Sequence, residues 1–235
     1  MKKIALIISV ALTVGISSCK KEIKEINKVI LDTGVKVDFV CADIFMQQPL
    51  VRMSEKIREE NKEWLEHILI NSKAIGAIGV EIPFVDNSSI KTKLEIEELI
   101  SVTKDAFKLA KEIGMKISLE TDLPPKDFKN LLEEINLDHV MANYDIGNSA
   151  SLGYDPIEEL ESYGQKILNV HVKDRKLGGT TVPLGTGNAD IKCVFEKLNE
   201  MGYEGGITMQ AARGEHDVAA ATEQLTYTLE MLNQI

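Results

Sequence analysis

The chain has 235 residues, and 27 Lys and Arg against 37 Asp and Glu give it a formal net charge of −10. Its 44% hydrophobic and 27% charged content is typical of a globular protein and excludes disorder over most of the length. The acidic balance disfavours a nucleic-acid-binding protein, because contacts to phosphates need a basic face. Three widely spaced cysteines, Cys19, Cys41 and Cys193, match neither a disulfide framework nor a zinc ribbon.

Residues 1–19 have the order of features found in a secretory signal. Lys2 and Lys3 precede a short apolar run, which ends at Ser17, Ser18 and Cys19. The final residues resemble a bacterial lipobox, so we expect a lipoprotein attached to the cell envelope through a lipid on Cys19. The alternative is that this segment forms a buried first β-strand, in which case the protein is cytoplasmic.

Residues 20–235 alternate between helical and extended patterns and form one predicted domain. A helix with an apolar stripe over 20–34 comes first. Six strands follow, each with a helix behind it. The predicted strands cover 35–45, 77–85, 115–120, 139–145, 167–174 and 205–210. The predicted helices end at Gly76, or cover 96–114, 126–136, 156–164, 191–202 and 217–232.

The repeated strand-then-helix pattern predicts an α/β fold with a parallel sheet, because the strands are nearly continuous apolar runs. Its regularity favours a TIM-barrel-like (β/α) barrel over a dinucleotide-binding sheet, and the segment 185–190 lacks the third glycine of that fingerprint. With about six recognisable units, the barrel lacks its first strands. Either it is open, or the N-terminal segment supplies a strand, or the start of the gene is lost. Open strand edges predict a homo-oligomer.

Polar residues end four of the predicted strands. They are Glu120, Asp145, His171 and Gln210. In a parallel α/β barrel the strands end at the face that carries the chemistry, and a charge placed in an apolar strand is costly unless it is paired or bound to a metal. Two carboxylates, one imidazole and one amide oxygen suit a divalent cation, with Mn²⁺ or Mg²⁺ favoured and Zn²⁺ or Co²⁺ as alternatives.

The segments LETDLPP, NYDIGNSASLGYDPIEEL, ILNVHVKDRKLGGTTVPLGTGNAD and GYEGGITMQAARG together resemble the sugar phosphate isomerase/epimerase family. That family has the xylose-isomerase-like TIM barrel, and the similarity is to its L-ribulose-5-phosphate 3-epimerase or hexulose-6-phosphate isomerase branch. The resemblance implies one metal ion on Glu120, Asp145, His171 and Gln210. It also implies proton transfer next to a carbonyl through an enediolate.

The resemblance places the catalytic pair at Glu120 and Gln210, and here the sequence departs from the family, which has a second glutamate. An amide is a metal ligand through its oxygen but is no base near neutral pH. Glu120 then acts alone, or an acid from Glu215, His216 or Asp217 replaces the second base.

Candidate substrate-binding residues follow the strand-end positions. Asn148 follows Asp145, Lys173 and Arg175 follow His171, and Arg213 follows Gln210. The basic residues would bind a sugar hydroxyl or phosphate, and the alternatives are a solvated charge cluster and, around Asn148, a Gly-Asn turn. The glycine-rich loop 177–190 either covers the substrate or is a connection capped by Asp190.

Three classes of function remain open at this point. The favoured one is a metal-dependent sugar or sugar-phosphate isomerase/epimerase with a small-molecule substrate. The second is an envelope-anchored carbohydrate-binding relative without turnover, and the third is a metal phosphoesterase of the endonuclease IV type. The charge of −10 argues against the third. Glu81 and Asp86 end a further strand, without a geometric reason to place them at the metal.

Overall fold

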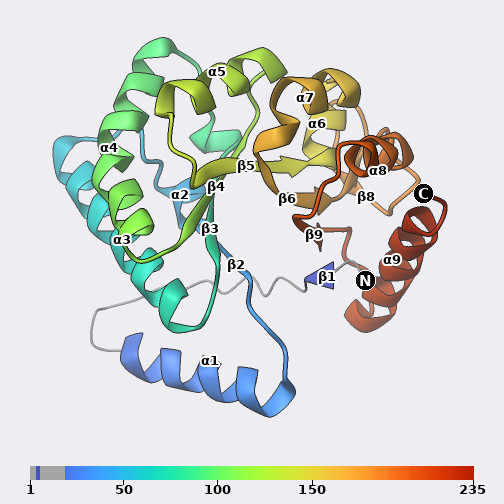
Figure 1. The fold of residues 1–235 in the computed structure, drawn as a ribbon, viewed down its shortest axis with the longest axis horizontal. Coiled ribbons are helices and arrows are strands. Elements are labelled where there is room, and N and C mark those ends of the chain that lie inside the picture. Colours follow the sequence, from blue (N-terminus) through green and yellow to red (C-terminus); the bar gives the residue numbers. More distant parts are fainter. Residues whose placement is uncertain (1–3, 6–18) are drawn as a thin grey trace. The chain divides into compact units, whose positions relative to one another are not determined.

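The structure is a computed structural model that describes residues 4–5 and 19–235 (Figure 1). By internal contacts the chain divides into two compact units. Unit 1 holds residues 1–4, 122–130 and 142–235, and unit 2 holds residues 5–121 and 131–141.

Unit 2 is a run of parallel strands with helices between them. Its helices are α1 (Cys19–Thr33), α2 (Ile44–Gln47), α3 (Glu55–Ala74) and α4 (Lys93–Glu112), and a 3₁₀ turn, η1, covers Asp86–Ser88. Its strands are β2 (Phe39–Cys41), β3 (Gly79–Phe84) and β4 (Lys116–Thr121). β3 pairs in parallel with β2 and with β4. All residues of β3 are buried, as expected for a strand covered on both faces.

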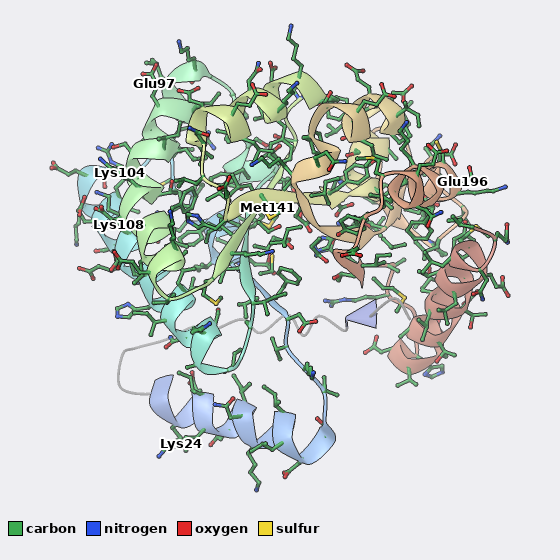
Figure 2. The ribbon with its side chains drawn as sticks, viewed as in Figure 1. Lys24, Glu97, Lys104, Lys108, Met141 and Glu196 are labelled. Carbon is green, nitrogen blue, oxygen red and sulfur yellow. The ribbon has the colours of Figure 1, made fainter. Side chains whose placement is uncertain are left out.

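Helix α4 shows how the local sequence sets one of these elements. Thr92 accepts a hydrogen bond from the backbone N–H of Glu95, and the Glu95 carboxylate accepts from Thr92, which is a capping box. Leu99 and Phe107 lie on its buried face, while Figure 2 shows Lys104 and Lys108 on the outer side. The helix is therefore amphipathic, with its apolar stripe toward the core.

Unit 1 repeats the parallel arrangement. Helix α5 (Pro125–Ile135) and strand β5 (Val140–Asp145) each have residues in both units. Then follow α6 (Ile146–Leu152), α7 (Pro156–Tyr163), η2 (Gly164–Lys166), β6 (Ile167–Val172), β7 (Asp174–Arg175), β8 (Thr181–Val182), α8 (Ile191–Glu200), β9 (Gly206–Met209) and α9 (Asp217–Leu232). β6 pairs in parallel with β5 and with β9, and β7 and β8 form a separate antiparallel pair.

The six predicted strand-then-helix units are confirmed as β2, β3, β4, β5, β6 and β9 with the helices that follow them. One local expectation is wrong: the strand predicted over 35–45 is limited to Phe39–Cys41, because the chain enters α2 at Ile44. Around Asn148, the alternative of a Gly-Asn turn is excluded, because the residue lies in helix α6. The segment 177–190 contains the short strand β8, and its predicted cap is confirmed: Asp190 accepts a hydrogen bond from the backbone N–H of Cys193.

The predicted signal segment lies largely outside the described residues. Ile4–Ala5 form a two-residue strand, β1, which is the neighbour of β9 in the sheet order. That pairing is what the alternative of an N-terminal strand predicts, and the signal hypothesis stays a prediction. Among the described residues, none of the helices combines the length and the apolar character needed to cross a membrane.

Candidate metal and substrate site

In unit 2, two glutamates lie side by side on neighbouring strands. Glu81 on β3 is level with Ser118 on β4, and Glu120 comes two residues after Ser118. Because side chains alternate along a strand, both glutamates are on the same face. They are 1% and 5% exposed, and a carboxylate oxygen of one lies within 4.8 Å of one of the other. The sequence offers no geometric reason to place Glu81 at a metal, and the available signal is a charged residue within an apolar strand.

Cys41 extends this group of acids onto β2. It is level with Glu81 across the β2–β3 pair, and its thiol is within hydrogen-bond distance of Asp43 Oδ1 at 3.0 Å and of Glu81 Oε1 at 3.4 Å. Burial raises the pKa of Cys41 well above its usual value, and the carboxylates of Glu81, Asp43 and Glu120 raise it further. Cys41 is therefore a neutral donor to the acids rather than a thiolate nucleophile.

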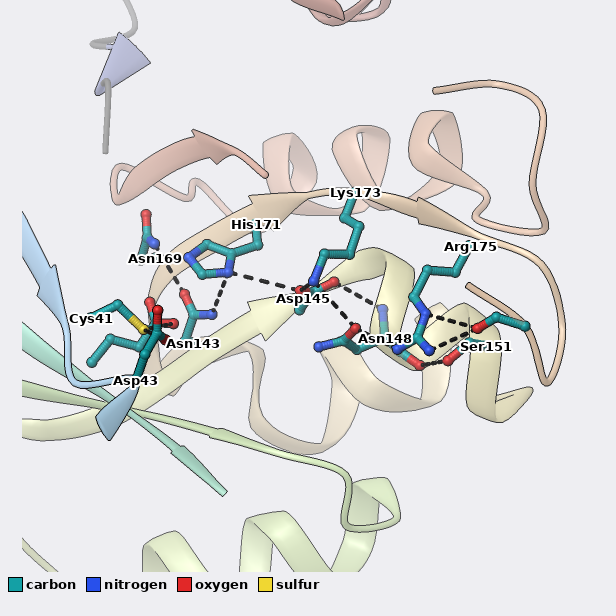
Figure 3. A network of polar contacts seen from close by, with 12 residues as sticks. Cys41, Asp43, Asn143, Asp145, Asn148, Ser151, Asn169, His171, Lys173 and Arg175 are labelled. Carbon is teal, nitrogen blue, oxygen red and sulfur yellow. Dashed lines mark hydrogen bonds and ion pairs between the residues drawn. The ribbon is translucent and has the colours of Figure 1, made fainter. Parts of the chain in front are cut away.

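In unit 1, Asp145 ends β5 and begins α6. Its Oδ1 accepts a hydrogen bond from the backbone N–H of Asn148 at 2.8 Å, and its Oδ2 accepts one from the Lys173 ammonium at 2.7 Å (Figure 3). Burial on its own raises the pKa of Asp145, but Lys173 and His171 outweigh it, and the pKa falls from 3.8 to about 2. Asp145 is thus an ionised, buried carboxylate that both caps a helix and pairs with a cation.

His171 lies beside Asp145, as the register of β5 and β6 requires. Its side chain is 2% exposed, and its Nδ1 is 3.8 Å from Asp145 Oδ2 and 3.1 Å from Asn143 Nδ2. Because Nδ1 faces β5, the other ring nitrogen, Nε2, is the one directed away from these two partners.

The predicted substrate-binding residues divide into two groups. Asn148, Lys173 and Arg175 lie together: Asn148 Oδ1 accepts from Arg175 Nη1 at 2.9 Å and lies 3.4 Å from Lys173 Nζ. Arg175 also donates to the carbonyl of Gly179. Arg213 is exposed and lies apart from them, in the segment after β9. Gln210, predicted as a metal ligand and catalytic residue, is also exposed there and donates its backbone N–H to the carbonyl of Val172.

A glycine lets Lys173 approach α6. A Cβ placed on Gly147 would lie 2.6 Å from Lys173 Cγ and 2.9 Å from its carbonyl carbon. Such distances are far inside van der Waals contact, so any side chain at 147 would displace Lys173. The Asp145–Lys173 pair depends on a glycine at this place in the helix.

Glu159 on α7 is a buried acidic residue that sequence reasoning missed. The Glu159 carboxylate on α7 accepts hydrogen bonds from the hydroxyls of Ser149 at 2.7 Å, Tyr163 at 2.9 Å and Tyr144 at 3.1 Å. Burial raises the pKa of Glu159 from 4.5 to about 7, against the opposite effect of these donors. It borders a cavity of about 210 Å³ in unit 1 whose lining also includes Asp190.

Comparison with known proteins identifies relatives of this chain. The curated relatives include inosose dehydratase of Clostridium tetani, 31% identical over 166 residues, which are 60% of this chain and 54% of that protein. They also include the putative L-ribulose-5-phosphate 3-epimerase UlaE of Shigella dysenteriae, 25% identical over 188 residues, which are 75% of this chain and 64% of that protein. The chain thus spans between half and two thirds of the length of these relatives.

A solved structure gives the same fold. The crystal structure of the IOLI protein with a bound zinc atom matches with a TM-score of 0.77 at 17% identity, over 90% of this chain and 82% of that one. The family description "Xylose isomerase-like TIM barrel" matches residues 17–234. The chain therefore belongs to the xylose isomerase-like TIM barrel family, with the α/β fold that its six strand-then-helix units predicted.

Proposed function

We propose that the protein is a metal-dependent isomerase or epimerase of a small sugar or sugar phosphate. The observation that carries the proposal is the buried pair of Glu81 and Glu120 on adjacent strands in a chain of this family. Carboxylate oxygens within 4.8 Å of each other are a suitable donor set for a divalent cation, so these residues fit one. Relatives named as a sugar-phosphate epimerase and as an inosose dehydratase support a polyhydroxylated substrate.

The proposed ligands in unit 2 are Glu81 and Glu120. In unit 1, His171, Asp145 and Gln210 remain predicted ligands. Asp145 would have to exchange the Lys173 ammonium for the cation, since Lys173 is on its Oδ2. Mn²⁺ or Mg²⁺ is favoured by the oxygen-rich set, and Zn²⁺ is supported by the zinc in the structural relative.

Glu120 is the proposed base, and removes the proton from the carbon next to the substrate carbonyl. When bound, a divalent cation draws electron density from that carbonyl and stabilises the negative charge that develops on its oxygen. In isomerisation, Glu120 returns the proton to the neighbouring carbon while the hydroxyl proton passes from one enediolate oxygen to the other. In epimerisation, Glu120 keeps the proton and a second acid donates one to the opposite face. Because the amide of Gln210 is neither an acid nor a base near neutral pH, isomerisation on one face is the simpler outcome.

Lys173 and Arg175 are proposed to contact substrate hydroxyls or phosphate from the same end of β6. Both already have internal partners, Asp145 and the carbonyl of Gly179. Their ammonium and guanidinium groups have further donors to offer, because Lys has three and Arg five N–H groups. Their role in the proposal is to orient the substrate, and proton transfer remains with Glu120.

Conversion of a panel of free ketoses and their phosphates tests the function. The purified protein should interconvert at least one ketose with its aldose or its epimer, and a chelator should remove the activity until Mn²⁺, Mg²⁺ or Zn²⁺ is restored. Activity that survives exhaustive chelation would contradict metal dependence. Sugar binding without conversion in the presence of each of these metals would favour the carbohydrate-binding alternative.

A further inference from the structure

A buried serine lies beside the two glutamates of unit 2. Ser118 on β4 is level with Glu81 on β3, and it precedes Glu120 by two residues on its own strand. Level residues of paired parallel strands, and alternate residues of one strand, face the same side of a sheet. Ser118, Glu81 and Glu120 are 0%, 1% and 5% exposed. The hydroxyl of Ser118 therefore shares a buried face with both carboxylates.

Glu81 is the central residue of a row that crosses three strands of unit 2. On the β2 side, Cys41 is level with Glu81, and its thiol lies 3.4 Å from Glu81 Oε1. On the β4 side, the level residue is Ser118. A thiol and a hydroxyl, both hydrogen-bond donors, thus flank this carboxylate.

The hydroxyl of Ser118 has no hydrogen-bond partner among the residues that the structure describes. A buried hydroxyl that is not hydrogen-bonded is costly, because it has given up its bonds to water. Ile117 and Leu119, the neighbours of Ser118 on β4, are also buried, and both are apolar. An alanine would occupy the same place on the strand without this cost, so the hydroxyl is available to a group bound at the glutamates.

The chemistry of a divalent cation identifies the kind of atom that Ser118 would contact. Such a cation is surrounded by oxygen ligands, which are carboxylates and water molecules. Carboxylates that bind a metal are themselves held by hydrogen bonds from neighbouring groups. A serine hydroxyl is a suitable donor, because it has one O–H and carries no charge that would repel the cation.

We propose that Ser118 is a positioning residue of the cation site, and that its hydroxyl donates a hydrogen bond to an oxygen ligand of the cation held by Glu81 and Glu120. The inference rests on the proposed function for this cation. It adds a residue that binds neither the cation nor the substrate directly. Ser118 fixes the direction of an oxygen ligand, and proton transfer remains with Glu120.

Two buried serines of unit 2 provide a matched comparison. Ser72 on α3 is also 0% exposed, and its hydroxyl also has no hydrogen-bond partner among the described residues. Ser118→Ala and Ser72→Ala each remove such a hydroxyl, so neither should lower the melting temperature of chelator-treated protein.

Cation affinity should separate the two variants. In a calorimetric titration with Mn²⁺, Ser118→Ala should bind about 10–100-fold more weakly than the parent, the range typical of a partner behind a metal ligand. Ser72→Ala should bind as the parent does. Glu81→Gln should weaken binding at least as much as Ser118→Ala, which identifies the titrated cation as the one at this site.

Each other result has a definite meaning. A chelator-treated Ser118→Ala that melts below Ser72→Ala would show that the hydroxyl stabilises the cation-free fold, and would overturn the inference. Parent affinity in Ser118→Ala, with weakened binding in Glu81→Gln, would overturn the inference and leave the proposed metal site intact. A parent protein that binds none of Mn²⁺, Mg²⁺ and Zn²⁺, or parent affinity in Glu81→Gln, would contradict the proposed metal site and the inference with it.

Discussion

The Lys173 ammonium lies 2.7 Å from Asp145 Oδ2, and the two side chains are 13% and 1% exposed. The pair joins the residue that ends β5 to the residue that follows β6, and Asp145 also caps α6. This one contact therefore joins the start of α6 and a buried negative charge to an ammonium group beside the proposed substrate position.

Removing the positive charge of Lys173 should strongly destabilise the protein. Lys173→Met leaves Asp145 buried and ionised, and breaking a buried pair costs about 3–5 kcal/mol. The stabilisation from Asp145 is complete above the unfolded pKa of 3.8 and is lost as pH falls toward about 2, so the variant should lose most at neutral pH. Urea unfolding at pH 7 measures the difference.

Two further variants make that result specific. Lys192→Met, at a side chain that is 55% exposed, should change the free energy of unfolding by less than about 1 kcal/mol. Lys173→Met combined with Asp145→Asn should recover part of the loss, because the uncompensated charge is gone. Equal effects of Lys173→Met and Lys192→Met would show that the contact contributes nothing.

Gly147→Ala should disturb the same contact from the helix side. Its Cβ would lie 2.6 Å from Lys173 Cγ, so Lys173 must move, at a cost of about 1–3 kcal/mol. Leu152→Ala, at an exposed position of the same helix, is the control. The prediction fails if the melting temperature of Gly147→Ala equals or exceeds that of the parent.

Glu159 should make stability fall as pH rises. Its pKa is raised from 4.5 to about 7, so between these values the folded protein holds a proton that the unfolded chain has released. The stabilisation is complete below about pH 4.5 and is lost as pH rises through about 7, with a size on the order of 2–3 kcal/mol.

Glu159→Gln should remove this slope, while Glu158→Gln at the neighbouring exposed position should retain it. Chemical denaturation between pH 5 and pH 8 gives both results. A parent protein whose Glu159-dependent stability is flat across that interval would show that Glu159 is ionised throughout, as its three hydroxyl donors favour.

Sequence predicted those parts of the molecule that leave a local signal. The strands are apolar runs, so Asp145 and His171 stood out as charged or ionisable residues within them, and the structure confirms that they are neighbours. Helix α6 could not be predicted in this way, because IGNSASL contains Gly, Asn and Ser, which are weak helix formers, and its start depends on the Asp145 cap. The low helix propensity of this segment is offset there by a local cap.

The role of Glu81 needed three-dimensional information of another kind. Its neighbour Glu120 is 39 residues away in sequence, and only the register of β3 and β4 puts the two carboxylates on one face. The Lys173–Asp145 pair could not be predicted for the same reason, because neither sequence segment indicates which basic residue contacts which acid. Periodicity predicts elements, whereas such pairs depend on the register between strands.

The N-terminal segment gives a prediction of its own. If residues 1–19 are a lipoprotein signal, the chain from residue 20 should be soluble with a melting temperature within about 2 °C of the parent, and Cys19→Ala should abolish incorporation of labelled palmitate in a bacterial host. A large drop in melting temperature on deletion would instead show that Ile4–Ala5, beside β9, is part of the fold.

The most direct test of the central claim is incorporation of solvent deuterium into a substrate found in the ketose panel. With a divalent cation present, the parent protein should exchange the proton on the carbon next to the carbonyl, and Glu120→Gln should lose that exchange by at least about 100-fold while remaining folded, the scale expected of a general base. Glu133→Gln, at an exposed glutamate of α5, should exchange at the parent rate. Exchange at the parent rate in folded Glu120→Gln would contradict the claim that Glu120 transfers the proton.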